Sequence, residues 1–327
     1  MLNNKRLQKR QEDIHIKNTI AGIQSITPHI HRVRLSTDAY NYDDIANKLG
    51  KIFIPNDSEE QARRRMPPYR KMGIIKKYGV VFFSPLMTKQ YYPQLILEIA
   101  NVTASELIDL HSKAPEFKVS YIEYAIDFGV RSPEHAAKIF SVLMKTMYFP
   151  YARSVEMRGT PYYGWMEPRE GNSVYKANSC AIRKNTEVVI YERGPDSLQR
   201  EKRWWAYKDI DRVRLEFREF RKSQKLQKIG VDSLADLIES PRFSDYCFPK
   251  KGQNKIQFKC FEDPNLPKYW ERYSFGEEMA LESFQAEFLD RKEKITNINR
   301  CKADHPLFIS LLKRIRLKIK EFDKNWL

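Results

Sequence analysis

Hydrophobic and polar residues alternate along several stretches of the chain, and such alternation predicts β-strands that bury one face. In the first half, the alternating stretches are 29–36, 78–84 and 94–99. Residues 42–49 and 103–113 instead have the spacing of helices. The second of these helices is expected to begin with a capping box, because Thr103 stands three positions before Glu106.

The same order of elements returns further along the chain. A strand is predicted over 119–128 and a helix over 133–147, with Ser132 as its N-cap. A stretch rich in Gly, Pro and Tyr, 158–179, is expected to be irregular. Two strands and a helix then follow, over 187–192, 212–220 and 233–239. A repeated strand–helix–strand–strand–helix order is typical of RRM-like sheets. We therefore expect an α+β fold in which two RRM-like units form a largely antiparallel sheet, followed by a C-terminal helical region.

These patterns divide the chain into four expected regions. They are a basic N-terminal arm or helix (1–25), a first RRM-like unit (26–115), a second RRM-like unit (116–240) and a helical C-terminal region for DNA recognition (241–327). In the last region, hydrophobic residues recur at helical spacing from Phe308 to Phe322. The cations between them are Lys313, Arg314, Arg316, Lys318 and Lys320. This pattern fits a packed helix with a solvated basic face as well as it fits a helix that contacts DNA.

The charge of the chain narrows the class of partner. Its 327 residues include 58 Lys and Arg against 42 Asp and Glu, a formal net charge of +16. Such a charge favours a polyanionic partner, and the 13% of aromatic residues favours one with bases on which to stack. The sequence has neither the run of about 18 apolar residues that a membrane span needs nor a secretory signal. We expect a cytoplasmic protein that binds nucleic acid and does not contact a membrane.

Two segments combine cations with aromatic residues. The segment 63–71 suits a loop that clamps phosphates, and 200–208 places Trp204 and Trp205 beside cations, as unpaired bases would require. The two tryptophans fit a core position equally well. The residues predicted to bind nucleic acid are Arg63, Arg64, Arg65, Arg70, Lys71, Arg183, Lys184, Arg193, Arg203, Trp204 and Trp205.

The polar faces of three predicted strands carry residues with a shared chemical use. Alternation places Asp127, Tyr191 and Glu216 on such faces, and they converge if the strands are neighbours. Two carboxylates can hold Mg²⁺ or Mn²⁺ beside a phosphate, and a tyrosine hydroxyl is an adequate nucleophile once a base takes its proton. Arg214 and Arg218 share the face of Glu216 and suit the flanking phosphates. The alternative is that these residues form cross-strand ion pairs.

Several short motifs occur in a characteristic order between residues 115 and 225. They are Tyr-Ala-Ile-Asp-Phe ending at Phe128, Tyr162-Tyr163-Gly164, Ile182-Arg183-Lys184, 189–194 (Val-Ile-Tyr-Glu-Arg-Gly) and 213–218 (Val-Arg-Leu-Glu-Phe-Arg). The set resembles the trans-acting Rep class of plasmid rolling-circle replication initiators, with related relaxases and filamentous-phage initiators. This resemblance implies site-specific nicking and joining of DNA at a replication or transfer origin. It also implies that Tyr191 becomes joined to a 5′ phosphate, with Asp127 and Glu216 as ligands of a divalent metal.

The sequence leaves some of these roles open. Arg218 stands where the family often has a second acid, so the third metal ligand is undetermined, with Glu123 and Glu187 as alternatives. Rival nucleophiles are Tyr162, Tyr163 and Tyr175. His29 and His31 lie one residue apart on a predicted strand, which sends both imidazoles to one face and makes them an alternative metal site.

The expected partners follow from the resemblance and the charge. They are origin DNA, single-stranded or in a hairpin, together with a helicase, and nicking at paired sites would suit a homodimer. Two other functions fit the charge alone, namely a non-catalytic nucleic-acid-binding protein and a basic structural protein. No Walker A pattern is present, so an ATP-driven motor is not predicted.

Overall fold

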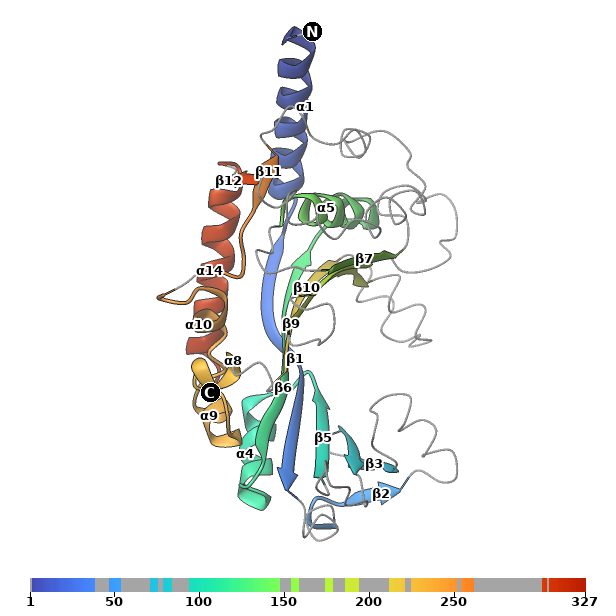
Figure 1. The fold of residues 1–327 in the computed structure, drawn as a ribbon, viewed down its shortest axis with the longest axis vertical. Helices are drawn as coiled ribbons and strands as arrows, with labels where there is room; N and C mark the ends of the chain where they lie inside the picture. Colours follow the sequence, from blue (N-terminus) through green and yellow to red (C-terminus); the bar gives the residue numbers. More distant parts are fainter. Residues whose placement is uncertain are drawn as a thin grey trace. The chain divides into compact units, whose positions relative to one another are not determined.

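The structure is a computed structural model. It describes residues 2–38, 47–53, 71–75, 79–83, 94–147, 154–158, 174–178, 186–193, 212–220, 225–251, 254–261, 302–304 and 306–327. The chain folds into two compact units, each built from three separate stretches (Figure 1). Unit 1 comprises Met1–Pro28, Ala125–Phe217 and Tyr246–Lys320, and unit 2 comprises His29–Tyr124, Arg218–Asp245 and Glu321–Leu327. The four regions predicted from the sequence are contiguous, whereas the two units interleave.

Unit 2 contains a sheet in which β5 lies beside β1. Its strands follow the order β2 (Lys51–Phe53), β3 (Lys71–Ile75), β4 (Gly79–Phe83), β5 (Gln94–Ala100), β1 (Ser25–Asp38) and β6 (Lys118–Gly129). Neighbours from β2 to β1 pair antiparallel. The helices are α4 (Ala104–Lys113), α8 (Lys225–Lys228) and α9 (Leu234–Glu239), and α4 contacts α9 on one side of β1 and β6 (Figure 1).

One face of this sheet is apolar and closely packed. Val33 and Leu35 of β1 and Leu97 of β5 are inaccessible to solvent, as alternation predicts for a half-buried strand. Tyr124 of β6 stacks on Phe243, with 4.6 Å between the ring centroids, and its hydroxyl donates to the carbonyl of Pro241 at 2.5 Å. The polar side chains of β1, β5 and β6 are therefore directed to the opposite face.

Unit 1 contains a second run of neighbouring strands. The order is β6, β10 (Arg212–Phe220), β9 (Thr186–Glu192), β8 (Val174–Asn178) and β7 (Ser154–Arg158), and the pairs β7–β8 and β8–β9 are antiparallel. The helices are α1 (Leu2–Ala21), α5 (Pro133–Thr146), α14 (Phe308–Lys324) and α10 (Phe243–Cys247), of which the last two continue into unit 2. β11 (Lys259–Phe261) and β12 (Lys302–Asp304) form a separate antiparallel pair. α5 contacts both α1 and β9.

N-caps fix where three of the helices begin. The Thr103 hydroxyl accepts from the backbone of Glu106 and the Glu106 carboxylate accepts from the backbone of Thr103, so the predicted capping box is confirmed. Ser132 caps α5, and Ser233 caps α9. Each cap contributes about 1 kcal/mol. The Ser132 cap lies three residues after the end of β6, the strand that carries Asp127.

The expected α+β class is confirmed. Predicted strands correspond to β1, β4, β5, β6, β9 and β10, and predicted helices to α4, α5, α9 and α14. Residues 1–25 are largely helical, with Ile16 and Ile20 buried, so the helical alternative applies there. Residues 39–46 lie outside the described residues, and this range includes most of the predicted helix 42–49. Throughout the part of the chain that the structure describes, every helix is too short or too polar to cross a membrane.

The expectation that residues 158–179 are irregular was wrong at one end. Residues 174–178 form β8, which pairs with β9 on one side and with β7 on the other. The sequence Val-Tyr-Lys-Ala-Asn alternates only weakly. Its extended conformation depends on hydrogen bonds to neighbouring strands, and those bonds are invisible in the local pattern.

Candidate active site

The candidate site lies on three neighbouring strands of unit 1, β6, β10 and β9. In β10 the apolar residues Val213, Leu215 and Phe217 are inaccessible to solvent, and Phe217 packs edge-to-face on Tyr246. Burial of this face turns the alternate residues, Arg214 and Glu216, to the other one. Both are nevertheless buried, at 3% and 0% exposure. Charged residues at such positions require partners.

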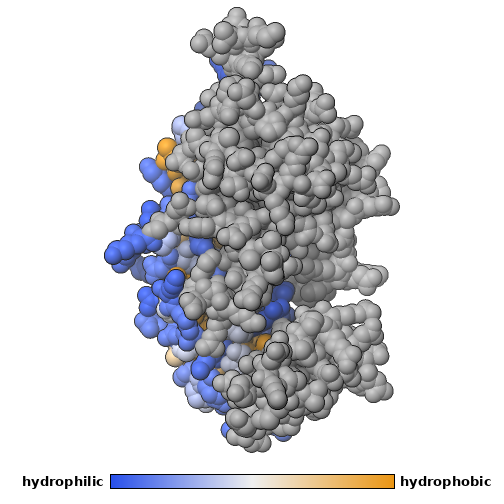
Figure 2. Space-filling model, viewed as in Figure 1, coloured by the Kyte–Doolittle hydropathy of each residue, from blue (hydrophilic) through white to orange (hydrophobic). Residues whose placement is uncertain are grey.

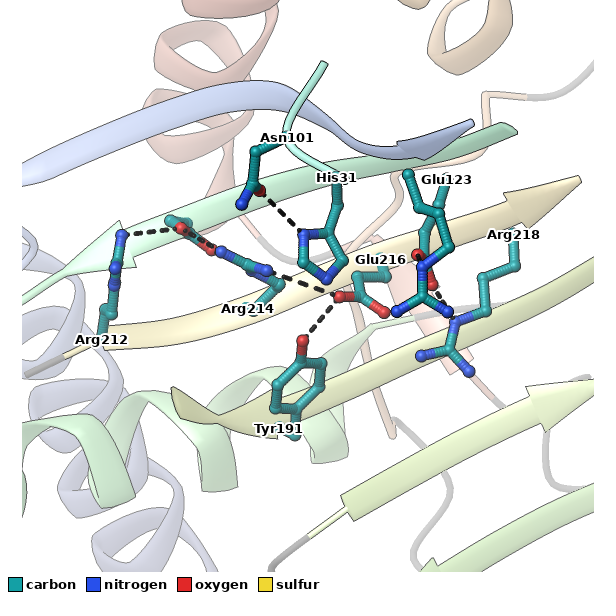
Figure 3. Close-up of polar contacts among 10 residues, drawn as sticks. His31, Asn101, Glu123, Tyr191, Arg212, Arg214, Glu216 and Arg218 are labelled. Atoms are coloured by element: carbon teal, nitrogen blue, oxygen red, sulfur yellow. Dashed lines mark hydrogen bonds and ion pairs between the residues drawn. The ribbon is translucent and has the colours of Figure 1, made fainter. Parts of the chain in front are cut away.

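Tyr191 is a partner of Glu216. The Tyr191 hydroxyl donates a hydrogen bond to Glu216 Oε1 at 2.6 Å, from β9 to its neighbour β10 (Figure 3). Burial raises the pKa of Tyr191 above its ordinary value, and the negative charge of Glu216 raises it further. The nearby charges of Arg214 and Arg193 act in the opposite direction but do not cancel the rise. The phenol is therefore protonated at neutral pH and acts as a donor.

Asp127 of β6 is held by two arginines. Arg214 binds it through both oxygens, with Nε to Oδ1 at 2.6 Å and Nη2 to Oδ2 at 2.8 Å. Arg212 adds a third bond, Nη1 to Oδ2 at 3.0 Å. Burial opposes the charge of Arg214, but its hydrogen bonds to Asp127 and the negative groups around it raise its pKa overall. Arg214 therefore remains a cation, fixed in a bidentate pair.

The same guanidinium approaches the second acid. Arg214 Nη1 lies 3.8 Å from Glu216 Oε1, the oxygen that also accepts from Tyr191 (Figure 3). A continuous chain of contacts thus joins five side chains, which we call the unit 1 network. Its members are Tyr191, Glu216, Arg214, Asp127 and Arg212. Its two acids face two guanidiniums and a protonated phenol, and the charge of Arg193 also acts on Tyr191 and Arg212.

This arrangement does not fit the expected Mg²⁺ or Mn²⁺ between Asp127 and Glu216. Both oxygens of Asp127 accept hydrogen bonds from arginines, and the guanidinium of Arg214 contacts both acids. A divalent ion bound there would have to displace a fixed cation. The described residues also include no group of three or more His, Cys, Asp or Glu able to hold a metal.

Arg218 belongs to a second cluster, in unit 2. Its Nε lies 2.5 Å from Glu123 Oε1 (Figure 3). Arg32 Nε lies 3.5 Å from the other oxygen of Glu123. Arg34 Nε binds Glu98 at 2.8 Å, and Arg32 Nε lies 4.0 Å from the same carboxylate. We call these five residues the unit 2 network. Glu123, one alternative for the third metal ligand, is thus paired with arginines, while Glu187, the other, is buried in β9 of unit 1.

The two predicted histidines share one face of β1. The His29 and His31 rings lie edge-to-face, with 6.1 Å between centroids, while Ile30 between them is buried. His31 Nδ1 is 3.1 Å from Asn101 Oδ1, an interaction that sets the orientation of the imidazole (Figure 3). The predicted alternation is confirmed, and a metal role for this pair stays a prediction.

Most residues predicted to bind nucleic acid fall outside the described part of the chain. These are Arg63, Arg64, Arg65, Arg70, Arg183, Lys184, Arg203, Trp204 and Trp205. Lys71 begins β3, and Arg193 follows β9 and is buried. Of the rival nucleophiles, Tyr162 and Tyr163 also lie outside, and Tyr175 stands opposite Ile190 in the β8–β9 register.

Sequence reasoning missed several members of the two networks. No role was predicted for Arg212, Arg32, Arg34 or Glu98. The signal that could have found them was alternation, in His-Arg-Val-Arg and in Arg-Val-Arg-Leu-Glu. Alternation predicts on which face of a strand a residue lies, but it does not predict which strand is the neighbour.

Comparisons with known proteins show a weak likeness at the level of structure. No protein-family model matches the chain, and no curated protein matches its sequence significantly. Among solved structures, the chain is similar to a rolling-circle replication initiator protein from Geobacillus stearothermophilus, with a TM-score of 0.40 and 10% identity. The match covers 81% of this chain and 97% of that one. This likeness does not identify the function, which we infer from the chain's own residues.

Proposed function

We propose that this chain nicks and rejoins DNA at a replication or transfer origin, with Tyr191 as the nucleophile. The observation that carries the proposal is the hydrogen bond from Tyr191 to Glu216 inside a network that also holds Arg214 and Asp127. The alternation of the sequence alone singles out Asp127, Tyr191 and Glu216, without any use of their contacts. The net charge of +16 and the order of the short motifs support the same function.

The proposed chemistry uses Glu216 as a general base. Tyr191 Oη attacks the phosphorus while its proton passes to Glu216 Oε1, 2.6 Å away, and the bond from phosphorus to the 3′ oxygen breaks. The proton then reaches the departing 3′ oxygen, so the products are a 3′ hydroxyl and a 5′ phosphotyrosine. Since the raised pKa of Tyr191 leaves little free tyrosinate at neutral pH, transfer to Glu216 has to accompany the attack. The reverse reaction rejoins the strand.

Arg212 is the proposed contact to the phosphate. Its side chain is 31% exposed, whereas that of Arg214 is 4% exposed, and both are held by Asp127. A partly exposed guanidinium that is fixed on a carboxylate is already oriented, so a phosphate oxygen can approach it from solvent. This role was expected for Arg214 and Arg218. Arg212 is proposed to make the phosphate contact in their place, and Arg214 is the inner cation of the network.

Helix α14 is the proposed contact to duplex DNA. It buries Phe308, Leu311, Ile315 and Ile319 on one side. Its exposed residues up to Lys320 include five cations, Lys313, Arg314, Arg316, Lys318 and Lys320, and no acid. Two of these cations are fixed, because Arg314 donates to the carbonyl of Ile23 at 3.0 Å and Arg316 stacks on Phe248. In the space-filling view, the described residues on the visible face are mostly hydrophilic, with a few small apolar patches (Figure 2). Rows of cations without acids suit the phosphate backbone.

One observation favours a second candidate function, non-catalytic nucleic-acid binding. Tyr191 is only 5% exposed, and its raised pKa keeps it protonated, as a neutral phenol that is a poor nucleophile. In that case the unit 1 network would serve to hold three strands together, and DNA would bind through cations such as those of α14. The two functions differ in whether a covalent intermediate forms.

A trapping experiment separates them. The protein is incubated with labelled single-stranded and hairpin oligonucleotides of randomised sequence, with Mn²⁺ or with EDTA, and denatured before electrophoresis. We expect a covalent adduct, mapped to Tyr191 by mass spectrometry and abolished in Tyr191→Phe. Tyr124→Phe is the matched control, since it also removes one buried hydroxyl bond, the one to Pro241. An adduct on another tyrosine would move the nucleophile, and salt-sensitive binding without any adduct would favour the second function.

A further inference from the structure

We infer that the guanidinium of Arg214 takes the place of a divalent metal in the unit 1 network, so that the proposed strand transfer proceeds without one. The inference rests on the proposed function for its chemical meaning. Its structural basis is independent of that function, because it concerns which cation the two buried acids bind. Three properties of Arg214 support it, namely its geometry, its burial and its charge balance.

The geometry leaves no pair of carboxylate oxygens open to a shared metal. Asp127 accepts from Arg214 through both oxygens, at 2.6 and 2.8 Å, and from Arg212 at 3.0 Å. The Glu216 oxygen nearest to Arg214 accepts from Tyr191 at 2.6 Å. A divalent metal binds carboxylate oxygens at about 2.0–2.6 Å, which these guanidinium contacts prevent.

Burial makes this cation a permanent part of the site. The side chains of Arg214, Asp127 and Glu216 are 4%, 5% and 0% exposed. Its neighbours raise the pKa of Arg214 further above its ordinary value, so it cannot lose its proton to make room for a metal. A second cation beside it would meet a fixed positive charge that little solvent screens.

The charges of the network also suit the reaction. Before the attack, Arg212 and Arg214 are paired with the acids Asp127 and Glu216, Arg193 lies near enough to act on Tyr191, and Tyr191 is protonated. When Glu216 takes the phenolic proton, the network gains one positive charge at the moment when the attacked phosphate gains one negative charge. Arg214 is then left without its second anion and can stabilise the phosphorane, which is the task usually given to a metal.

Metal binding tests the inference without any need for activity. Mn²⁺ binding to the full chain, without DNA, is measured by electron paramagnetic resonance of the free ion. We expect the Asp127→Asn variant and the wild type to bind Mn²⁺ with the same affinity, because Asp127 is not a metal ligand in the wild type. Arg214→Ala exposes two acids to a common space, so we expect it to gain a site at least ten-fold tighter. Adding Asp127→Asn to that variant should abolish the new site.

The matched control is Arg218→Ala, the same substitution in the same strand. Arg218 pairs with Glu123 in unit 2, so we expect its removal to create no Mn²⁺ site that depends on Asp127. If Arg214→Ala fails to fold by circular dichroism, the comparison of wild type with Asp127→Asn and with Glu216→Gln still decides. A wild-type Mn²⁺ site that either of these variants removes would overturn the inference.

The trapping experiment gives a second readout. We expect the rate of adduct formation to agree within two-fold in EDTA and in Mn²⁺. An adduct that forms only with Mn²⁺ would overturn the inference and leave the proposed function standing. If no adduct forms under any condition, the proposed function fails, and Mn²⁺ binding still decides which cation the two acids hold.

Discussion

The two networks use the same pairing rule but differ in their exposure to solvent. In each, an acid of β6 pairs with an arginine of β10, Asp127 with Arg214 in unit 1 and Glu123 with Arg218 in unit 2. The side chain of Arg214 is 4% exposed, whereas that of Arg218 is 25% exposed. A guanidinium that still reaches water can bind a second anion, but a buried one has its partners fixed. Only the unit 1 network also includes a tyrosine hydroxyl.

The depth of burial explains why, of the two networks, the unit 1 network is the candidate active site. Catalysis depends on charges that are held before the substrate arrives, in surroundings that do not screen them. The unit 2 network has buried acids, but its arginines are 22–28% exposed, so water competes for their charge. Four predictions test this contrast, beginning with the largest expected effect.

Removing the acid should cost far more stability in unit 1 than in unit 2. Asp127→Ala leaves Arg214 charged and buried without its main partner, and breaking a buried pair in this way costs about 3–5 kcal/mol. Glu123→Ala leaves Arg32 and Arg218, which can hydrate, so we expect about 1–2 kcal/mol. Urea unfolding of both variants measures the difference. Equal losses would show that the depth of burial does not distinguish the two networks.

Tyr191→Phe should lower stability while leaving the charges in place. It removes the hydroxyl that donates to Glu216, and the loss of a hydrogen bond to a charged group costs about 1.5–3 kcal/mol. Tyr124→Phe removes a bond to a backbone carbonyl and should cost about 1 kcal/mol. The same urea series gives both values. If Tyr191→Phe were the milder change, Glu216 would have another donor of equal strength.

Alkaline pH should weaken unit 1 through the same tyrosine. The pKa of Tyr191 is raised in the folded state, so an unfolded chain loses this proton at lower pH than the folded one. The stability that Tyr191 contributes is therefore full below about pH 10, the ordinary tyrosine value, and is lost as pH rises further. Unfolding free energies from pH 8 to 11 should fall more steeply for wild type than for Tyr191→Phe. Parallel curves would contradict the raised pKa.

The smallest expected effect concerns the exposed cations of α14, which differ from both networks in having no exposed acid among them. Lys313→Ala or Lys320→Ala should weaken duplex binding only a few-fold. Each should also reduce the slope of log affinity against log salt by about 0.9 for every phosphate that the variant no longer neutralises. Fluorescence anisotropy over 50–200 mM salt measures the slope. Ser310→Ala, a neutral change in the same helix, is the control. An unchanged slope in both lysine variants would remove α14 from the DNA interface.

Local patterns predicted most of the elements that carry the site. Alternation located β6, β9 and β10, and a Ser or Thr before an amphipathic run located the starts of α4, α5 and α9. These signals are short-range, because each depends on side chains within a few positions of one another. They also assigned Asp127, Tyr191 and Glu216 to polar strand faces. The weaker strands β7 and β8 escaped prediction because they depend on pairing with distant segments.

The class of fold, the excess of positive charge and the residues on each polar strand face can all be predicted from the amino-acid sequence. The tertiary structure adds the pairing of Arg214 with Asp127, 87 positions away, and the hydrogen bond from Tyr191 to Glu216. It also decided that these groups are buried, which raises the pKa of Tyr191 and keeps Arg214 charged. The physical reason is that alternation fixes the direction of a side chain, whereas its partner and its dielectric surroundings depend on which strand lies beside it.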